Sequence, residues 1–173
     1  MATIQQASIF NVQATLNTQV ATDLAAVTRP AWLPTLPTIY YVWPETEITP
    51  PAFSFSHIDV GAVDAWESRN VGGGLKGVAQ EAIMDIGCWV TRKNNRNWNA
   101  QLNTMRDMVM TVVTSTTELV IKDYEANQSA PATTTFLVRV GDAVARGTVP
   151  DSNNPDIERV RMLVSYRWIF RSA

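Results

Sequence analysis

The stretch IERVRMLVSYRWIFR, from Ile157 to Arg171, decides the fold. Every second position is apolar: Val160, Met162, Val164, Tyr166, Trp168 and Phe170. The positions between them carry Arg161, Leu163, Ser165, Arg167, Ile169 and Arg171. Because successive side chains of a strand point to opposite faces, this alternation predicts one long strand. One of its faces is apolar, and other parts of the chain must cover that face.

Two segments have the spacing of amphipathic helices, with apolar residues three and four positions apart. The first, Ile9–Val27, has the stripe Val12, Leu16, Val20, Leu24 and Val27. The second, Trp98–Val113, has the stripe Trp98, Leu102, Met105, Val109, Val112 and Val113. Asn95 or Asn97 is the expected cap of the second helix. We expect both helices to cover the apolar face of the closing strand.

The remaining strands are expected to follow one another along the chain. They are Thr38–Trp43 as an edge strand between prolines, Phe53–Val60, Val78–Arg92, Leu119–Tyr124, Thr134–Val140 and Val144–Val149. Gly141-Asp142 is expected to form a turn. Few helices and consecutive strands predict an α+β fold, with a mostly antiparallel sheet and two amphipathic helices packed on one face. Residues 1–173 are interpreted as a single domain.

A long glycine-bearing connection, Gly61–Gly77, separates two of these strands. It is far longer than a tight hairpin turn, and loops above about 12 residues in a compact domain are usually functional or disordered. We therefore predict a projecting hairpin loop, or arm. It carries the candidate interface residues Trp66, Glu67, Arg69 and Lys76.

Composition excludes several broad classes of protein. Charged residues make up 17% and the net charge is −2, so the chain lacks the basic signature of a nucleic-acid binder. Polar residues interrupt every apolar run before it reaches about 18 residues, so we expect no membrane contact. The first residues lack the pattern of a secretory signal. The single cysteine cannot form an internal disulfide, which fits folding in a reducing cytosol.

The sequence offers little for catalysis, and we expect no enzyme activity, metal or cofactor. Gly72, Gly74 and Gly77 match a dinucleotide-binding spacing, but a strand pattern follows where that mechanism needs a helix. His57 is the only histidine, so a histidine metal cluster or a Ser-His-Asp triad is not easily built. Cys88 lies on the apolar face of a strand and is interpreted as a small buried side chain.

Asp85 is the carboxylate with the most unusual setting, because it lies on the second face of a core strand. A satisfied hydrogen-bonding role is favoured over acid–base chemistry. A local basic patch is formed by Arg92, Lys93 and Arg96, with Trp98 and Arg106 nearby. A solvated loop is favoured over contact with a nucleic-acid backbone.

The closing strand carries a ladder of arginines, Arg161, Arg167 and Arg171. These three side chains are candidate interface residues. They are expected to pair with acidic residues of a neighbouring strand or of a neighbouring subunit, and the sequence leaves both alternatives open.

The order of these elements resembles a known family. An amphipathic helix leads into the proline-broken segment Pro30–Pro51, which holds the aromatic strand TIYYVWP (residues 38–44). A strand pair with a long arm, a second helix and more strands follow, and the chain closes on RMLVSYRW (residues 161–168). This layout is similar to that of the tail terminator, or tail completion, proteins of long-tailed bacteriophages. The likeness covers most of the chain as an order of elements, so no individual functional residue carries over.

The resemblance implies a structural virion protein without catalysis. Such a protein assembles into a homo-oligomeric ring, typically a hexamer, which caps the tail-tube protein and joins it to the neck or head connector. The resemblance further implies that the arm at Gly61–Gly77 contacts another subunit or the tube. DNA passing through the channel is a further candidate contact. The expected location is the tail or neck of the virion, with assembly in the host cytoplasm.

Two other functions remain open on the sequence. One is a different head-tail connector, neck or capsid-decoration protein. The other is a small α+β enzyme or ligand-binding domain that uses Asp85 or another carboxylate.

Overall fold

A computed structural model describes residues 7–41, 48–62, 69–70, 76–77, 80–150 and 154–169. It contains the helices α1 (Ile9–Ala26) and α2 (Trp98–Ser115). The strands are β1 (Thr38–Tyr40), β2 (Ala52–Ala62), β3 (Arg69–Asn70), β4 (Lys76–Gly77), β5 (Gln80–Thr91), β6 (Glu118–Asp123), β7 (Ala132–Ala145), β8 (Val149–Pro150) and β9 (Ile157–Ile169).

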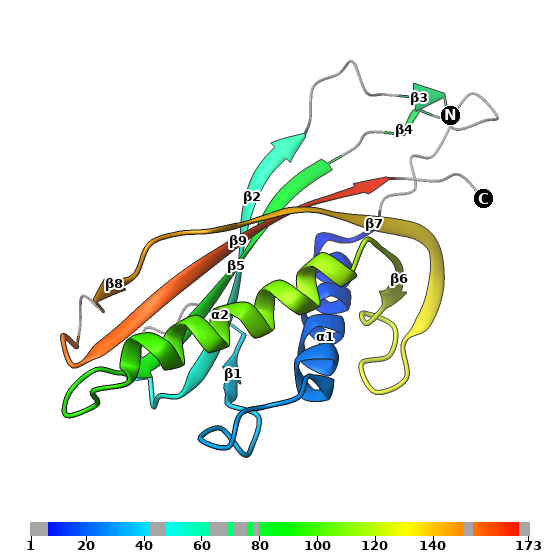
Figure 1. Cartoon of the computed structure of the whole chain (residues 1–173). Coiled ribbons are helices and arrows are strands. Elements are labelled where there is room, and N and C mark those ends of the chain that lie inside the picture. Colours follow the sequence, from blue (N-terminus) through cyan, green and yellow to red (C-terminus); the bar gives the residue numbers. More distant parts are fainter. Residues whose placement is uncertain are drawn as a thin grey trace.

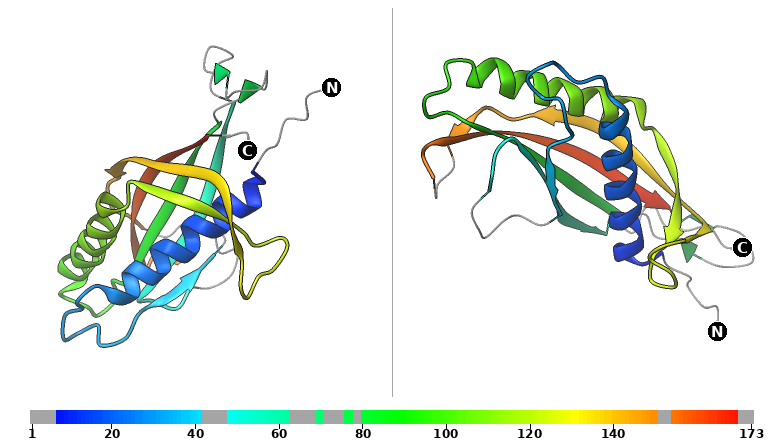
Figure 2. Two further views of the ribbon diagram at one scale, coloured as in Figure 1. Left: turned by 90° about the vertical axis from the view of Figure 1, so that its right-hand side faces the viewer. Right: turned by 90° about the horizontal axis from the view of Figure 1, so that it is seen from below.

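Seven strands form one curled sheet in the order β1-β2-β5-β9-β7-β6, with β8 beside β9. Among the described pairs, β1 and β2 are parallel and the others are antiparallel. Both helices lie on the same face of this sheet and cross one another (Figures 1 and 2). The predicted α+β class, with a mostly antiparallel sheet and two helices on one face, is confirmed.

The closing strand occupies the centre of the sheet. β9 pairs with β5 from Thr91↔Ile157 to Gln80↔Trp168, and its other edge pairs with β7. The predicted apolar face is buried: its side chains from Val160 to Trp168 are 0–4% exposed. Removing such side chains from water stabilises the fold by roughly 1.5–3 kcal/mol each for a Val, Leu, Phe or Met.

The two helices supply the cover that this face requires. The buried side chains of α1 include Val12, Leu16, Val20 and Leu24, and those of α2 include Leu102, Met105, Val109, Val112 and Val113. They join one core cluster with the inward residues of β2, β5, β7 and β9. The residue stripes that predicted the helices are therefore the surfaces that the helices bury.

Polar side chains fix the start of α1 to the β6–β7 connection. Ser8 caps the helix by accepting from the Asn11 backbone N–H. The buried Asn11 amide oxygen accepts from the backbone N–H groups of Tyr124 and Glu125, at 2.8 and 3.1 Å. Its amide nitrogen donates to the Asp123 carboxylate at 3.1 Å. Each polar group of this buried amide therefore has a partner, as burial requires.

The prediction of a turn at Gly141-Asp142 is wrong. β7 runs through these residues, and its pairing with β9 shifts between Val140 and Ala143, as in a β-bulge. Glycine favours bulges as well as turns, so composition does not separate them. Here the glycine permits a close approach, because a Cβ at Gly141 would lie 2.5 Å from Ser165 Oγ.

The prediction that Asn95 or Asn97 occupies the cap of α2 is confirmed for Asn97, but the capping bond differs from the usual one. Asn97 occupies the N-cap position but makes no side-chain capping bond. Instead, Asn95 Oδ1 accepts from the Asn97 backbone N–H at 3.1 Å, which tightens the preceding turn. Asparagine can satisfy either local pattern, and the turn is the one observed.

The arm is described only in part. β2 extends to Ala62, and β3 and β4 form a two-stranded antiparallel pair with Asn70 opposite Lys76. This pair lies beyond the ends of β2 and β5 (Figure 1). Residues 63–68, 71–75 and 78–79 lie outside the described part of the chain.

His57 connects the helix layer to the sheet. Its Nε2 lies 2.9 Å from Asn17 Oδ1 on α1, and its Nδ1 lies 2.9 Å from the Tyr166 hydroxyl on β9. An amide oxygen only accepts hydrogen bonds, so Nε2 carries the proton and Nδ1 accepts from Tyr166. Burial of the ring lowers the pKa of His57 from 6.5 to about 4, so the imidazole stays neutral in the fold.

Acidification is therefore expected to destabilise the protein through His57. The unfolded imidazole binds a proton below about pH 6.5 and the folded one only below about pH 4. The unfolded state thus binds more protons between these values, and stability falls as the pH is lowered through this window. Between pH 7.5 and pH 5 the loss from this group is about 2 kcal/mol.

Urea unfolding at several pH values measures this effect. The matched control is His57→Gln, which keeps one donor and one acceptor but does not titrate. The wild type should lose more unfolding free energy on acidification than the variant. Parallel pH profiles for the two proteins would contradict the assignment.

Candidate functional site

The sheet face opposite the helices is the main surface that the described elements leave uncovered. We call it the helix-free face. It is formed by Ile58 of β2, Glu81, Ile83 and Asp85 of β5, Arg161, Leu163, Ser165 and Arg167 of β9, Arg139 and Val144 of β7, and Glu118 and Val120 of β6. Three large apolar side chains on it are exposed: Ile58 by 45%, Val120 by 44% and Val144 by 49%.

A row of four charged side chains crosses this face. Glu81, Arg167, Arg139 and Glu118 are neighbours in register on β5, β9, β7 and β6. Arg167 Nη2 lies 3.3 Å from Glu81 Oε2, and Arg139 Nε donates to Glu118 Oε2 at 3.0 Å. The row holds two positive and two negative groups, so its own charge balances.

A second ion pair lies deeper in the same face. Arg161 Nε lies 3.0 and 3.3 Å from the two carboxylate oxygens of Asp85, and its Nη2 also contacts Oδ2. The Asp85 side chain is 2% exposed, whereas that of Arg161 is 32% exposed. This two-point contact gives Asp85 the satisfied hydrogen-bonding role that the sequence favoured.

These pairs show how the arginine ladder is partnered within the chain. Arg161 and Arg167 both pair with carboxylates of the neighbouring strand β5. The third member, Arg171, lies outside the described residues, as do Trp66 and Glu67 of the arm.

Arg69 and Lys76 belong to β3 and β4, where the structure describes the backbone alone. Lys76 lies opposite Asn70 in this pair. The structure therefore brings Arg161 and Arg167 onto one face of the sheet. The contacts of Arg69 and Lys76 with a partner stay a prediction.

A small second core, which sequence reasoning missed, lies at one end of the sheet. It consists of Ile48, Ala52, Trp89 and Ile157. The Trp89 indole N–H donates to Ser54 Oγ at 2.9 Å, and the Arg159 guanidinium lies 5.3 Å from the ring centroid. The available signal was Trp89 itself, a large apolar residue on the strand face that bears Asp85.

Gly87 makes room for this tryptophan. A Cβ at Gly87 would lie 2.5 Å from Ser54 Oγ and 2.7 Å from Trp89 Nε1. Both distances are shorter than atoms can approach without displacement. The absence of a side chain at Gly87 therefore leaves the space that the Trp89 ring and its hydrogen bond to Ser54 occupy.

The predicted basic patch is accompanied by acidic groups. Arg92 Nη1 lies 3.5 Å from Glu158 Oε2, and Lys93 Nζ lies 3.0 Å from Asp156 Oδ2. Arg106 pairs with Asp107 at 2.8 Å. These contacts favour the interpretation as a solvated loop.

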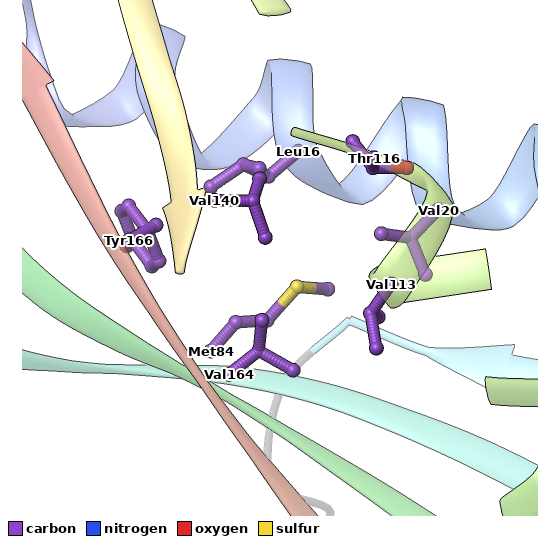
Figure 3. A pocket seen from close by; sticks show the side chains of 8 residues that line it. All are labelled: Leu16, Val20, Met84, Val113, Thr116, Val140, Val164 and Tyr166. Atoms are coloured by element: carbon purple, nitrogen blue, oxygen red, sulfur yellow. The ribbon is translucent and has the colours of Figure 1, made fainter. Parts of the chain in front are cut away.

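A small apolar cavity lies between the helices and the sheet. Figure 3 shows its lining side chains, which come from both helices, β5, β7, β9 and the residue after α2: Leu16, Val20, Met84, Val113, Thr116, Val140, Val164 and Tyr166. Its volume is about 10 Å³, and the Thr116 hydroxyl donates to the Val112 carbonyl. A cavity of this size and polarity is suited to neither a ligand nor an ordered water.

An open hollow of about 330 Å³ lies at the end of the sheet that carries Trp89. Its charged walls are Lys93 and Asp156, which pair with one another. Asp85 lines neither this hollow nor the apolar cavity.

The described residues offer few groups for chemistry. Among them, no set of three or more His, Cys, Asp or Glu side chains is placed to hold a metal ion. Cys88 is buried, and its desolvation raises the pKa of the thiol, as expected for a packed side chain. Neither described helix is long and apolar enough to cross a membrane.

Comparison with known proteins does not identify a family for this chain. No protein-family model and no curated protein matches this chain. One solved structure aligns with 97% of this chain and 100% of its own, at 13% sequence identity and a TM-score of 0.49. A likeness of this degree carries no argument about function.

Removing one member of the buried ion pair should have unequal effects. Arg161→Met leaves the buried Asp85 carboxylate without its partner and is expected to cost about 3 kcal/mol or more. Asp85→Asn leaves a partly exposed guanidinium that can reach water, so it should cost less. Equilibrium unfolding in urea at neutral pH compares the two variants. Equal losses would show that burial of Asp85 does not govern the pair.

Gly87→Ala is expected to destabilise the second core by about 1–3 kcal/mol, because the added methyl displaces Ser54 or Trp89. Gly147→Ala is the matched control, because a Cβ at Gly147 meets nothing within 4 Å. Thermal unfolding and near-ultraviolet circular dichroism of the tryptophans report the difference. A melting temperature lowered equally in both variants would contradict the packing argument.

Proposed function

We propose that this chain is a structural virion protein that acts like a phage tail terminator, assembling into a homo-oligomeric ring that caps the tail tube and joins it to the neck. The observation that carries the proposal is the helix-free face. It combines exposed apolar residues with three arginines that pair with carboxylates of the same chain. The resemblance of the order of elements to that of tail terminators is the reason for proposing this kind of assembly.

The exposed apolar residues support a protein partner. Ile58, Val120 and Val144 are nearly half exposed on strands of one face, whereas the corresponding positions of the other face are covered by helices. Exposed apolar area on a face of this kind is a common mark of a protein contact.

The pairing of three arginines on this face favours protein over DNA as the partner. Binding to the phosphate backbone depends on cations that neutralise phosphates. On this face, Arg139, Arg161 and Arg167 each lie beside a carboxylate of the same chain. A duplex would have to compete with these carboxylates, whereas a protein surface can use the paired groups as a polar rim.

Another head-tail connector, neck or capsid-decoration role is supported by the same face, because each of these proteins also binds copies and neighbours. A small α+β enzyme or ligand-binding domain is less well supported. Its best candidate, Asp85, is held by Arg161 and lines neither of the hollows described above.

Sedimentation velocity and negative-stain electron microscopy of the purified chain test the proposal, alone and mixed with tail-tube protein of the same virus. Rings, or rings seated on the ends of tubes, are the expected result. A strictly monomeric species in both experiments would overturn it. Rings that do not bind tubes would favour a connector or neck role.

A further inference from the structure

Each outer edge of the sheet is only half covered by its last strand. β1 pairs with β2 at Ala52–Ser54, and no described strand pairs with this edge of β2 farther along. β6 pairs with β7 between Ala132 and Arg139, and among the described strands none continues along the outer edge of β7 after Val140 (Figure 1). Unpaired strand edges present backbone donors and acceptors to any strand that can reach them.

The halves that no described strand covers lie at opposite corners of the sheet. One end of the sheet is the row Ala62–Gln80–Trp168–Val138, where the free half of β2 ends. The other end is the row Ala52–Trp89–Arg159–Val149, toward which the free half of β7 runs. β2 and β7 also run in opposite directions, because three successive antiparallel pairings separate them.

Two of the three exposed apolar residues of the helix-free face fall on these free halves. Ile58 lies on the free part of β2 and Val144 on the free part of β7. Both point to the helix-free face, because Ile58 pairs with Ile83 and Val144 pairs with Leu163. The neighbourhood of Val144 is open along the chain: every residue from 141 to 148 is exposed except the half-buried Ala143.

From these positions we infer that the free edge of β7 in one copy pairs antiparallel with the free edge of β2 in the next copy, bringing Val144 against Ile58. This inference rests on the proposed ring and specifies how its subunits join. The partner is a second copy of this chain because the two edges are complementary in direction and in the face that carries the apolar residue.

The β-bulges set the length of the joined segment. The pairing irregularity in β2 lies between Asp59 and Gly61, and that in β7 lies between Val140 and Ala143. With Val144 opposite Ile58, residues 143–146 face residues 56–59, so each bulge lies at the end of its segment. Bulges blunt sheet edges, and here they leave only a short regular stretch open to pairing.

Such a contact is compatible with closure into a ring. It joins two different patches, so it is heterologous, and a constant rotation between copies closes it. The free halves are offset along the strands, so each subunit shifts relative to its neighbour. A constant shift tilts the strands relative to the ring axis, as the register stagger does in a closed β-barrel.

Cysteine cross-linking tests the contact. The double variant Ile58→Cys/Val144→Cys is oxidised, or treated with a short bis-maleimide that tolerates a register shift. Non-reducing gels should show a ladder of multimers, because residues directly opposite one another have Cβ atoms about 4.5–5.5 Å apart. The native Cys88 is buried, so the wild type provides the background.

The matched control is Ile58→Cys/Val120→Cys. Val120 is as exposed as Val144 and lies on the same face, but on β6, which the inferred contact does not join to β2. This pair should give no ladder. In addition, Val144→Lys should weaken self-association by about tenfold or more, while Val144→Thr should have a smaller effect. Circular dichroism checks that each variant folds.

The outcomes separate this inference from the proposed function. Rings with a ladder from Ile58→Cys/Val144→Cys support both. Rings without that ladder, or with an equal ladder from the control pair, overturn the inference and leave the ring. A ladder from open filaments supports the edge contact and overturns the ring. Monomers without a ladder, alone and with tube protein, overturn both.

Discussion

The structure depends on burial of one face of β9. Its apolar side chains are almost fully buried in the core. The strand also pairs along both of its edges, so it lies at the centre of the sheet. β5 lies beside it along its length and contributes a matching apolar face. The helices α1 and α2 are held on this surface by the same need to remove apolar area from water. A one-residue slip of β9 would exchange its apolar and arginine-bearing faces.

Polar contacts then determine where the helices lie on that surface. Hydrophobic burial has no direction, whereas the bonds from Asn11 to the β6–β7 connection and from His57 to Asn17 join specific atoms of α1 and the sheet. Asn11 is buried and both ring nitrogens of His57 are partnered, as are the amide groups of Asn11. Such satisfied networks favour one arrangement of the layers, because any other arrangement would leave buried polar groups unpaired.

On the opposite face of the sheet, the strands are joined by ion pairs rather than covered by the described helices. No described helix covers it, so its charges are partnered across strands, as in the Asp85–Arg161 pair and the row from Glu81 to Glu118. Trp89 provides local cover at one end, packed over Gly87 with Ile48, Ala52 and Ile157. The apolar residues that stay exposed on this face, Ile58, Val120 and Val144, lie toward its margins on β2, β6 and β7. The proposed assembly would complete these margins without disturbing the core.

The sequence by itself determined the fold class and most of the elements. Alternation in Ile157–Arg171 and the stripes of Ile9–Val27 and Trp98–Val113 record which side chains leave water, and that requirement acts locally along the chain. The sequence also indicated that Asp85 occupies a core strand and would be satisfied rather than reactive. The bulge at Val140–Ala143 was not distinguishable from a turn, because the same small residues serve both.

Only the tertiary structure decided how distant residues meet. The pairing of Arg161 and Arg167 with β5, rather than with another subunit alone, depends on strand order and register, which no local pattern contains. The contact of His57 with both α1 and β9, and the place of Trp89 above Gly87, likewise depend on how the layers are stacked. The half-covered edges of β2 and β7 arise because β1 and β6 are short and lie at opposite corners of the sheet. The sequence determines which faces of the helices and strands are buried. The order and register of the strands then determine which charged residues pair within the chain and which strand edges are left unpaired.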